Sequence, residues 1–250
     1  MSGHSKWATI KHKKGAADKA RGKLFAKVAR QIEVAARAGG GDVQSNATLR
    51  TMVQKAKAAQ MTNDAIDRAI KRGTGEDSGE SYEAITYEGY APGGVALLID
   101  VLTDNRNRTG AEIRNVFAKL GGSMAEPGAV GWQFSRRGVL LVPEAVGEDE
   151  LMLAALEAGA DDVSRDGDSW RVTSEPSDVY DVKSSLEAAG IEVLSAESTM
   201  VPSTTIEVTD AGDARKILRI MDALEDNDDV QDVFANFDIA EALMDEVVGT

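Results

Sequence analysis

The first part of the chain has the apolar spacing of an amphipathic helix. From Ala16 to Ala38, apolar side chains recur at helical intervals, which places them along one face of a helix. Three glycines at 39–41 follow, and glycine is costly inside a helix but readily adopts the left-handed conformation that ends one. The pattern therefore predicts a long helix that buries one face and stops at the glycine run.

Two shorter helices are predicted before residue 75. One begins after Ser45 or Asn46, where apolar residues again keep helical spacing. The other begins after Thr62, whose hydroxyl can cap the first turn, and Gly73 is expected to end it. Segment 72–81 then contains no apolar residue and is expected to be a linker. The first part of the chain is thus predicted to be a three-helix bundle.

Beyond residue 81, short apolar runs alternate with helical patterns. The run at 94–102 is nearly continuous, as expected of a strand buried on both faces. A helix at 107–121 and a strand at 129–134 are predicted next. Residues 138–199 have the pattern β-α-β-β-α-β, which is the order of a complete ferredoxin-like unit. A last β-α-β pattern at 204–237 could complete a second such unit around the first.

The predicted fold class is α+β: an N-terminal three-helix domain followed by two ferredoxin-like units, one inserted in the other. The basic helical domain is predicted at 1–75. A split α+β domain is predicted at 80–135 and 202–250, and an inserted α+β domain at 136–201. One large mixed sheet after residue 80 is the alternative.

Charge divides the chain at the same linker. The whole chain has 28 Lys and Arg against 42 Asp and Glu, a net charge of -14. Residues 1–75 contain 16 basic and 5 acidic residues, a net of +11, and residues 76–250 contain 12 and 37, a net of -25. Such asymmetry predicts a polyanion-binding part joined to an acidic body. A solvated basic bundle without a partner is the alternative.

The first group of candidate nucleic-acid-binding residues lies in segment 3–23 and the helix that follows. Cations there can displace counterions from phosphates, and Trp7 can stack on an unpaired base or pack on the bundle. The candidates are Lys6, Trp7, Lys11, His12, Lys13, Lys14, Lys19, Arg21, Lys23 and Lys27. Along the helix, one face carries what we call the basic stripe, namely Lys19, Lys23, Lys27 and Arg30.

The second group lies in the loop LTDNRNRTG at 102–110, between the apolar strand and the next helix, with Thr109 as the expected N-cap. Crowded Asn and Arg side chains suit phosphates and base edges. The candidates are Asn105, Arg106, Asn107 and Arg108. The alternative is an ion-pair cluster of Asp104 with the two arginines that only fixes the loop.

Residues for catalysis and metal binding are scarce. The chain has no cysteine, and its only histidines, His4 and His12, lie among lysines. No phosphate-loop, hydrolase or metalloprotease motif is found, and the acidic clusters at 148–150 and 225–229 are expected to cap helices and solvate turns. We therefore expect no catalytic residue, no enzyme activity, no cofactor and no metal. The lack of a long apolar run or a secretory signal predicts a cytoplasmic location.

Four blocks of sequence, in order along the chain, are GHSKWATIKHKKGAADKARGKLFAKVARQIEVAAR, KAKAAQMTNDAIDRAIKRGTG, YEGYAPGGVALLIDVLTDNRNRTGAEIRNVF and DDVQDVFANFD. They resemble the YebC family of bacterial transcriptional regulatory and translation-associated proteins, which are relatives of the mitochondrial translational activator of cytochrome c oxidase subunit I. The resemblance spans essentially the whole chain. It implies a three-domain α+β protein of the cytoplasm with a role in gene expression.

Members of that family resemble either DNA-binding regulators or ribosome-associated factors that ease the synthesis of difficult peptide sequences. The predicted function is a nucleic-acid-binding regulator of gene expression, of the DNA-binding YebC type. The first alternative is a translation factor that binds ribosomal RNA through the basic N-terminal segment, since an acidic body would repel an extended duplex. The second alternative is an acidic protein-interaction adaptor. Expected partners are DNA or ribosomal RNA, with the ribosome as a further candidate, and neither a membrane nor a small-molecule substrate.

Overall fold

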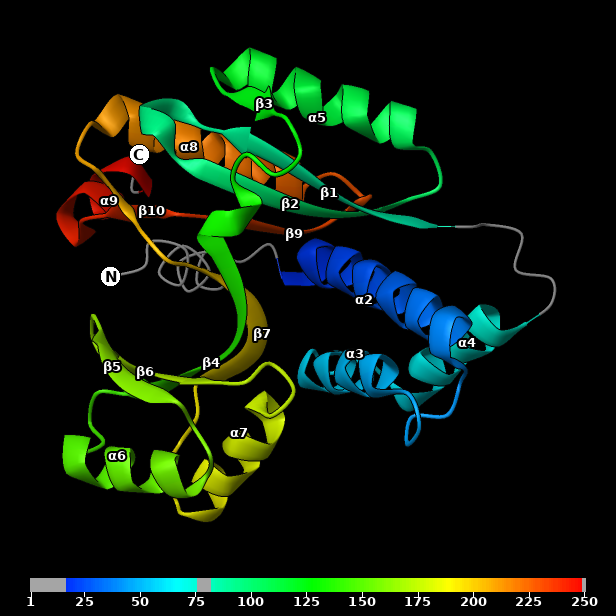
Figure 1. The fold of residues 1–250 in the computed structure, drawn as a ribbon, viewed down its shortest axis with the longest axis vertical. Coiled ribbons are helices and arrows are strands. Elements are labelled where there is room, and N and C mark those ends of the chain that lie inside the picture. The colour runs from blue at the N-terminus through cyan, green and yellow to red at the C-terminus, as the bar shows by residue number, and fades with distance from the viewer. Residues whose placement is uncertain (1–16, 76–81, 249–250) are drawn as a thin grey trace. The chain divides into compact units, whose positions relative to one another are not determined.

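The computed structural model describes residues 17–75 and 82–248 (Figure 1). The chain separates into two compact units. One unit is Trp132–Thr205, and the other contains the described residues up to Gly131 together with those from Ile206 onward. Most of the predicted linker lies outside the described residues. No helix in the described ranges is long and apolar enough to cross a bilayer.

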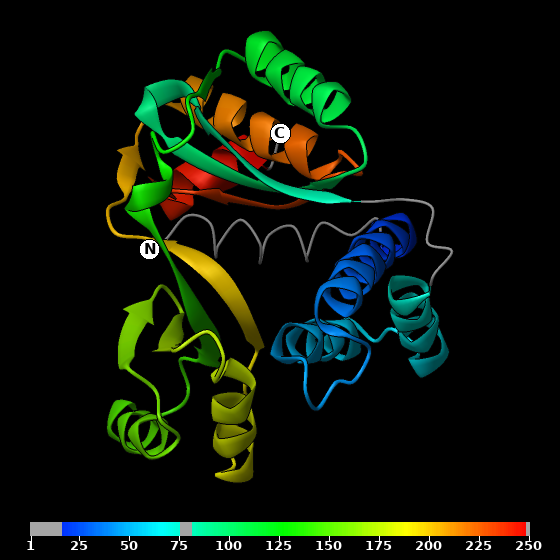
Figure 2. The same ribbon diagram turned by 45° about the vertical axis from the view of Figure 1, so that its right-hand side comes forward.

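Three helices form a bundle in the first part of the chain (Figure 2). They are α2 (Ala17–Gly39), α3 (Ala47–Ala58) and α4 (Asn63–Thr74). The predicted cap is confirmed, since the side chain of Thr62 accepts a first-turn N–H group of α4. The predicted start of α3 after Asn46 is also confirmed, and the side chain of Asn46 accepts a first-turn N–H group of that helix. Their buried faces meet in one apolar core, as the helical spacing predicts.

The prediction that Gly73 ends a helix was wrong. Gly73 lies inside α4 and is buried there. A Cβ atom at this position would lie 2.3 Å from the carbonyl oxygen of Glu33 and 2.8 Å from the Cβ of Ala36, both on α2. The glycine therefore lets two helix backbones approach closely. Gly40, by contrast, has a φ of 85° directly after α2, which confirms the predicted stop at the glycine run.

The same unit contains a four-stranded antiparallel sheet with the order β3-β1-β2-β9. Its central pair is the hairpin of β1 (Glu83–Tyr90) and β2 (Ala96–Thr103), joined by the short 3-10 helix η1 (Pro92–Gly94). The edges are β3 (Ser123–Ala125) and β9 (Val230–Ala235). The nearly continuous burial of β2 matches its prediction as a strand covered on both faces.

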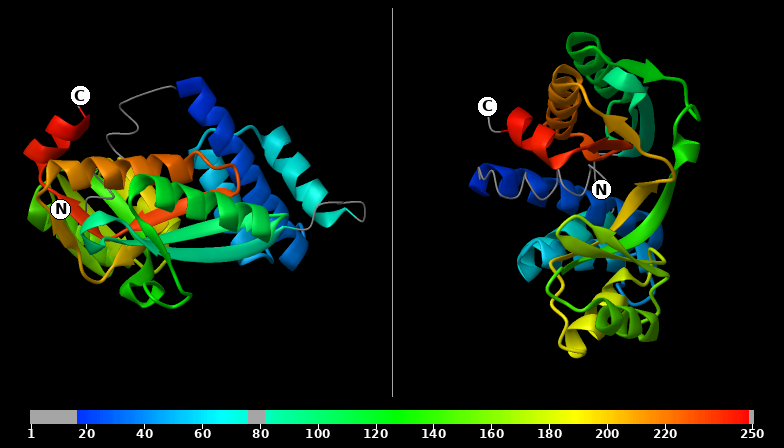
Figure 3. Two further views of the ribbon diagram at one scale, coloured as in Figure 1. Left: turned by 90° about the horizontal axis from the view of Figure 1, so that it is seen from above. Right: turned by 90° about the vertical axis from the view of Figure 1, so that its left-hand side faces the viewer.

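Two helices pack side by side on one face of this sheet (Figure 3). They are α5 (Arg106–Leu120) and α8 (Ala211–Glu225). Their apolar residues share a core with alternate positions of β2, because successive strand side chains point to opposite faces. Beside the sheet, β8 (Ile206–Val208) pairs in parallel with β10 (Phe237–Ile239), and α9 (Glu241–Val248) follows.

The second ferredoxin-like unit departs from its predicted strand order. The predicted strand at 129–134 was wrong, since this stretch contains the short 3-10 helix η2 (Gly131–Gln133) and β4 begins only at Phe134. The carboxylate of Glu88 accepts N–H groups in this stretch (see below), which removes donors from any strand ladder. β1, a strand that was not predicted from the sequence, pairs with β2. The first strand of the pattern predicted at 204–237 corresponds to β8, which pairs with β10 and does not join the four-stranded sheet.

The unit Trp132–Thr205 has its own four-stranded sheet with the order β5-β6-β4-β7, antiparallel throughout. Its elements are β4 (Phe134–Pro143), α6 (Glu148–Glu157), β5 (Asp162–Asp166), β6 (Ser169–Ser174), α7 (Val179–Ala188) and β7 (Ser195–Pro202). The predicted β-α-β-β-α-β order is confirmed, and its last strand begins later than expected. The two four-stranded sheets of the described residues are separate, so the single-sheet alternative was wrong.

The α+β fold class is confirmed. The predicted division into three domains stays a proposal, in which β4 and β7 extend slightly beyond the limits set at 136 and 201.

Candidate nucleic-acid interface

Part of the predicted interface lies outside the described residues. This part contains Lys6, Trp7, Lys11, His12, Lys13 and Lys14. Lys19 and Arg21 lie on the first turns of α2. For all eight residues the role in nucleic-acid binding stays a prediction.

Three members of the basic stripe, Lys23, Lys27 and Arg30, contact residues 225–229, the turn between α8 and β9, which we call the acidic turn. The Nζ of Lys23 donates to the Oδ1 of Asp226 at 2.8 Å and to its carbonyl oxygen at 3.1 Å. The Nζ of Lys27 donates to the carbonyl oxygen of Glu225 at 2.7 Å. These carbonyls lie at the C-terminal end of α8, where the helix dipole is negative and carbonyls lack helical partners. Cations on α2 therefore bind a local negative pole.

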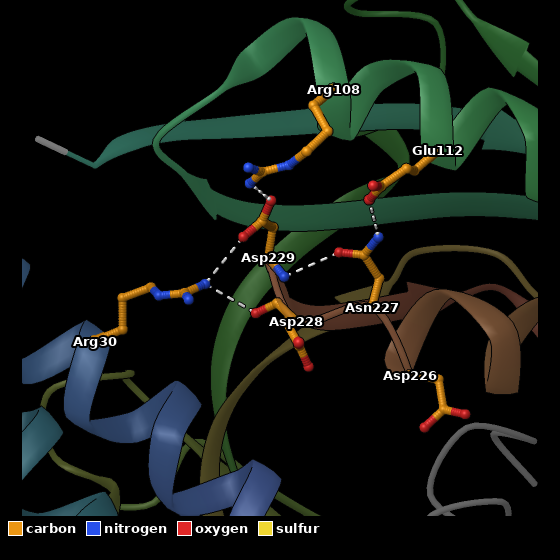
Figure 4. Close-up of a pocket in the computed structure, with 7 residues that line it drawn as sticks. All are labelled: Arg30, Arg108, Glu112, Asp226, Asn227, Asp228 and Asp229. Atoms are coloured by element: carbon orange, nitrogen blue, oxygen red, sulfur yellow. Dashed lines mark hydrogen bonds and ion pairs between the residues drawn. The ribbon is translucent and has the colours of Figure 1, made fainter. Parts of the chain in front are cut away.

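Arg30 continues this contact toward the sheet (Figure 4). Its Nη1 donates to the carbonyl oxygen of Asp228 at 2.9 Å, to the Oδ1 of Asp229 at 3.2 Å and to the carbonyl oxygen of Leu102 at 3.3 Å. Its guanidinium also lies 4.8 Å from the ring centroid of Tyr82, within the range of a cation–π interaction. Arg30 thus joins α2 to the acidic turn, to the end of β2 and to Tyr82.

Asp229 lies at the centre of this site and is only 6% exposed. Its Oδ2 accepts hydrogen bonds from Arg108 at 2.6 Å, from Thr109 at 2.7 Å and from Thr103 at 3.1 Å. Burial would raise the pKa of Asp229, but the hydrogen bonds from Thr109, Arg108 and Thr103 hold the pKa below its ordinary value. In turn, the pKa of Arg108 is raised by its hydrogen bonds to Asp229 and Asp104. Both groups are therefore charged at neutral pH.

Several side chains of the loop at 102–110 stabilise the fold, where the prediction was a binding loop. Asn105 is the N-cap of α5, since its side chain accepts the N–H group of Arg108 at 3.0 Å. The prediction of Thr109 as the N-cap was wrong, because Thr109 is fully buried within α5 and donates to Asp229. Arg108 also pairs with Asp104 at 2.8 Å. For Arg108 the structure therefore agrees with the alternative of an ion pair with Asp104. Asp229 is a further partner of Arg108 that was not predicted.

The other two candidates in this loop remain accessible. Arg106 reaches Glu83 at 3.5 Å while its side chain stays 64% exposed, and Asn107 is exposed on the first turn of α5. An exposed ion pair of this kind is weak, so Arg106 can exchange its partner for a phosphate. The role of Arg106 and Asn107 in nucleic-acid binding stays a prediction.

A cavity of about 480 Å³ lies at the centre of these contacts (Figure 4). Its lining contains Arg30, Arg108, Glu112, Asp226, Asn227, Asp228 and Asp229. Asn227 donates to the Oε2 of Glu112 at 2.7 Å. With four carboxylates against two guanidiniums, the cavity disfavours a phosphate in the arrangement seen. Within the described ranges, no group of three or more His, Asp or Glu is placed to hold a metal ion.

Sequence reasoning did not find Asp229, because the acidic cluster at 225–229 was interpreted as solvated turn carboxylates. The structure instead buries Asp229 under two arginines and two threonines. A usable signal is the position of Asp229 directly before Val230, where the last strand of the β-α-β pattern at 204–237 begins. Residues at the start of a buried strand face the ends of neighbouring elements, here the end of β2 and the start of α5.

A second buried carboxylate, Glu88 on β1, was also missed. It is 8% exposed and accepts the N–H groups of Gly128, Val130 and Gly131 at 2.7, 2.5 and 3.0 Å. Burial would raise the pKa of Glu88, but these backbone hydrogen bonds lower it overall. Its role is to fix the segment that precedes β4.

The chain is similar to a known protein family over most of its length. A model described as the TACO1/YebC protein N-terminal domain matches residues 5–76, and one described as the TACO1/YebC second and third domain matches residues 82–237. A relative from Rubrobacter xylanophilus, named "Probable transcriptional regulatory protein", is 60% identical over 251 residues and covers 100% of both chains. A relative of the same name from Halothermothrix orenii is 54% identical over 250 residues, with 99% of each chain covered.

A solved structure shows the same fold. The crystal structure of a conserved hypothetical protein, Aq1575, from Aquifex aeolicus matches with a TM-score of 0.77 and 45% sequence identity, covering 90% of this chain and 93% of that one. Together the two family models span nearly the whole sequence, and the resemblance noted from the four sequence blocks is confirmed. This chain belongs to the TACO1/YebC family.

Proposed function

We propose that this chain is a nucleic-acid-binding regulator of gene expression, and that its N-terminal segment 3–23 and the basic stripe of α2 form the binding surface. One observation carries the proposal: residues 1–75 have a net charge of +11 in a chain whose remainder has -25. Phosphate neutralisation by Lys and Arg supplies most of sequence-independent affinity. The names of the relatives, which describe probable transcriptional regulators, support duplex DNA as the first candidate ligand and agree with a protein that is not an enzyme.

Ribosomal RNA is the second candidate. The inserted region 136–201 contains 5 basic and 15 acidic residues, and such a region repels any extended duplex that approaches it. An irregular RNA surface can instead admit a narrow basic segment alone. α4 adds few side chains for reading bases in a major groove. Besides two aspartates, its exposed polar residues are Asn63, Arg68, Lys71, Arg72 and Thr74, and Arg72 pairs with Glu33.

The test is binding of the full chain to a duplex DNA and to a single-stranded RNA of equal length, over a range of salt concentrations. A variant with Lys11→Gln, Lys13→Gln and Lys14→Gln should bind more weakly. The slope of log affinity against log salt should fall by at most about 0.9 per lost contact on DNA and about 0.7 on RNA. A control with Lys119→Gln, Lys183→Gln and Lys216→Gln makes the same change of charge outside the bundle and should leave the slope unchanged.

Two outcomes decide between the candidates. Tighter binding to DNA at matched salt favours the transcriptional regulator, and tighter binding to RNA favours the translation factor. Equal affinity and slope for the triple variant and the unmodified chain would contradict the proposal and favour the adaptor alternative.

A further inference from the structure

We propose that the acidic turn competes with nucleic acid for the basic stripe of α2, so that phosphates bind there only when this intramolecular contact opens. The inference rests on the proposed function, because competition requires a stripe that binds phosphate. It adds that nucleic-acid binding by this surface is regulated within the chain itself. In the closed contact, the acidic turn binds the same cations of α2 that we propose to bind phosphates.

The acidic turn offers the stripe the same chemistry as a nucleic-acid backbone. Lys23, Lys27 and Arg30 are four and three residues apart, so they lie in one row along α2. Each donates to an oxygen of the acidic turn between 2.7 and 3.2 Å away. The acceptors are carboxylates, two carbonyls at the negative end of α8 and the carbonyl of Asp228 within the turn. The phosphates of a nucleic-acid backbone would likewise present a row of anionic acceptor oxygens to these cations.

The contact is graded from exposed to buried. The side chains of Lys23 and Asp226 are 34% and 80% exposed, whereas those of Arg30 and Asp229 are 22% and 9% exposed. Exposed ion pairs are weak and are screened by salt, so a phosphate can displace Asp226 from Lys23. The Arg30–Asp229 pair is further supported by Thr103, Thr109 and Arg108. Opening should therefore start at Lys23, with Arg30 as the retained anchor.

The first test removes one charge from the exposed end of the acidic turn. Asp226→Asn should bind duplex DNA or single-stranded RNA about two- to fivefold more tightly than the control, which corresponds to the strength of an exposed ion pair. The matched control is Asp245→Asn, which removes the same charge from an exposed position on α9. The salt slope should also steepen in Asp226→Asn, because more of the stripe is available to phosphates. Equal affinities for the two variants would overturn the proposal.

The second test locks the contact. The chain has no cysteine, so Lys23→Cys with Asp226→Cys creates a unique pair that a short bismaleimide can join. The joined variant should bind at least about tenfold more weakly than the same variant left unjoined, because apparent affinity falls with the fraction of binding-competent molecules. As a control, Glu33→Cys with Arg72→Cys joins α2 to α4, where the native side chains lie 3.2 Å apart. Joining that pair should leave binding unchanged.

Failure of this inference and failure of the proposed function give different results. If the unmodified chain and the unjoined variants bind nucleic acid and the lock has no effect, the competition is refuted and the proposed function stands. If none of them binds either nucleic acid, the proposed function is refuted, and the competition with it.

Discussion

Asp229 receives hydrogen bonds from side chains on three elements, namely Arg30 of α2, Thr103 of β2, and Arg108 and Thr109 of α5. Buried polar groups of this kind must be satisfied, because an unpaired charge or donor in the interior is costly. A single carboxylate thus decides how the ends of these elements meet.

Replacing this carboxylate should destabilise the fold. For Asp229→Asn we expect the free energy of unfolding to fall by about 2 to 4 kcal/mol, since two arginines lose their buried partner. Urea denaturation followed by circular dichroism would measure the loss. Asp245→Asn, on an exposed position of α9, should change stability by less than about 0.5 kcal/mol. Equal stability of both variants would show that the network is not needed.

Glu88 should make stability depend on pH. Its pKa is lowered from an ordinary value of 4.5 by the N–H groups that it accepts, against the opposing effect of burial. A carboxyl group with a lowered pKa in the folded state contributes stability that is present above its unfolded pKa and is lost as the pH falls through the folded pKa. The free energy of unfolding should therefore decrease below about pH 4.5 more in the unmodified chain than in Glu88→Gln. Parallel pH profiles of the two proteins would contradict this expectation.

At the scale of elements, the approach of α2 and α4 depends on Gly73. Gly73→Ala should destabilise the bundle by about 1 to 3 kcal/mol, because the added methyl group would overlap the backbone of α2. This loss should exceed the gain that alanine brings through its helix propensity. Gly22→Ala on α2 is the control, since nothing lies within 4 Å of its added Cβ; it should stabilise the helix by up to about 1 kcal/mol. Hydrogen exchange of the bundle amides would compare the two, and equal protection would refute the close-packing role.

At the scale of the whole molecule, the unit Trp132–Thr205 should fold on its own. Its sheet pairs only its own strands, and its apolar core is formed by residues within the same segment. Separate cores are what allow separate folding. Expressed alone, residues 132–205 should give a dispersed amide spectrum and a cooperative thermal transition. A disordered spectrum would show that the rest of the chain is required.

The sequence by itself determined the features that depend on near neighbours along the chain. Thr62 could be predicted as a cap because its side chain acts on a residue three positions later. The helical spacing of the bundle and the element order of 138–199 are likewise local patterns. The division of charge at residue 75 needs no structure, because it is a count. These features suffice for the fold class and for the main part of the proposed interface.

Only the tertiary structure decided the features that depend on distant partners. Whether Gly73 ends a helix or admits a second backbone depends on Glu33, forty positions earlier. The place of β1 beside β2, and of β8 beside β10, reflects a choice among strands with similar local patterns. The role of Asp229 arises because β2, α5 and α2 converge on it. Strand pairing and charge pairing are set by contacts across the fold, and residue spacing along the chain does not by itself determine which distant partners meet.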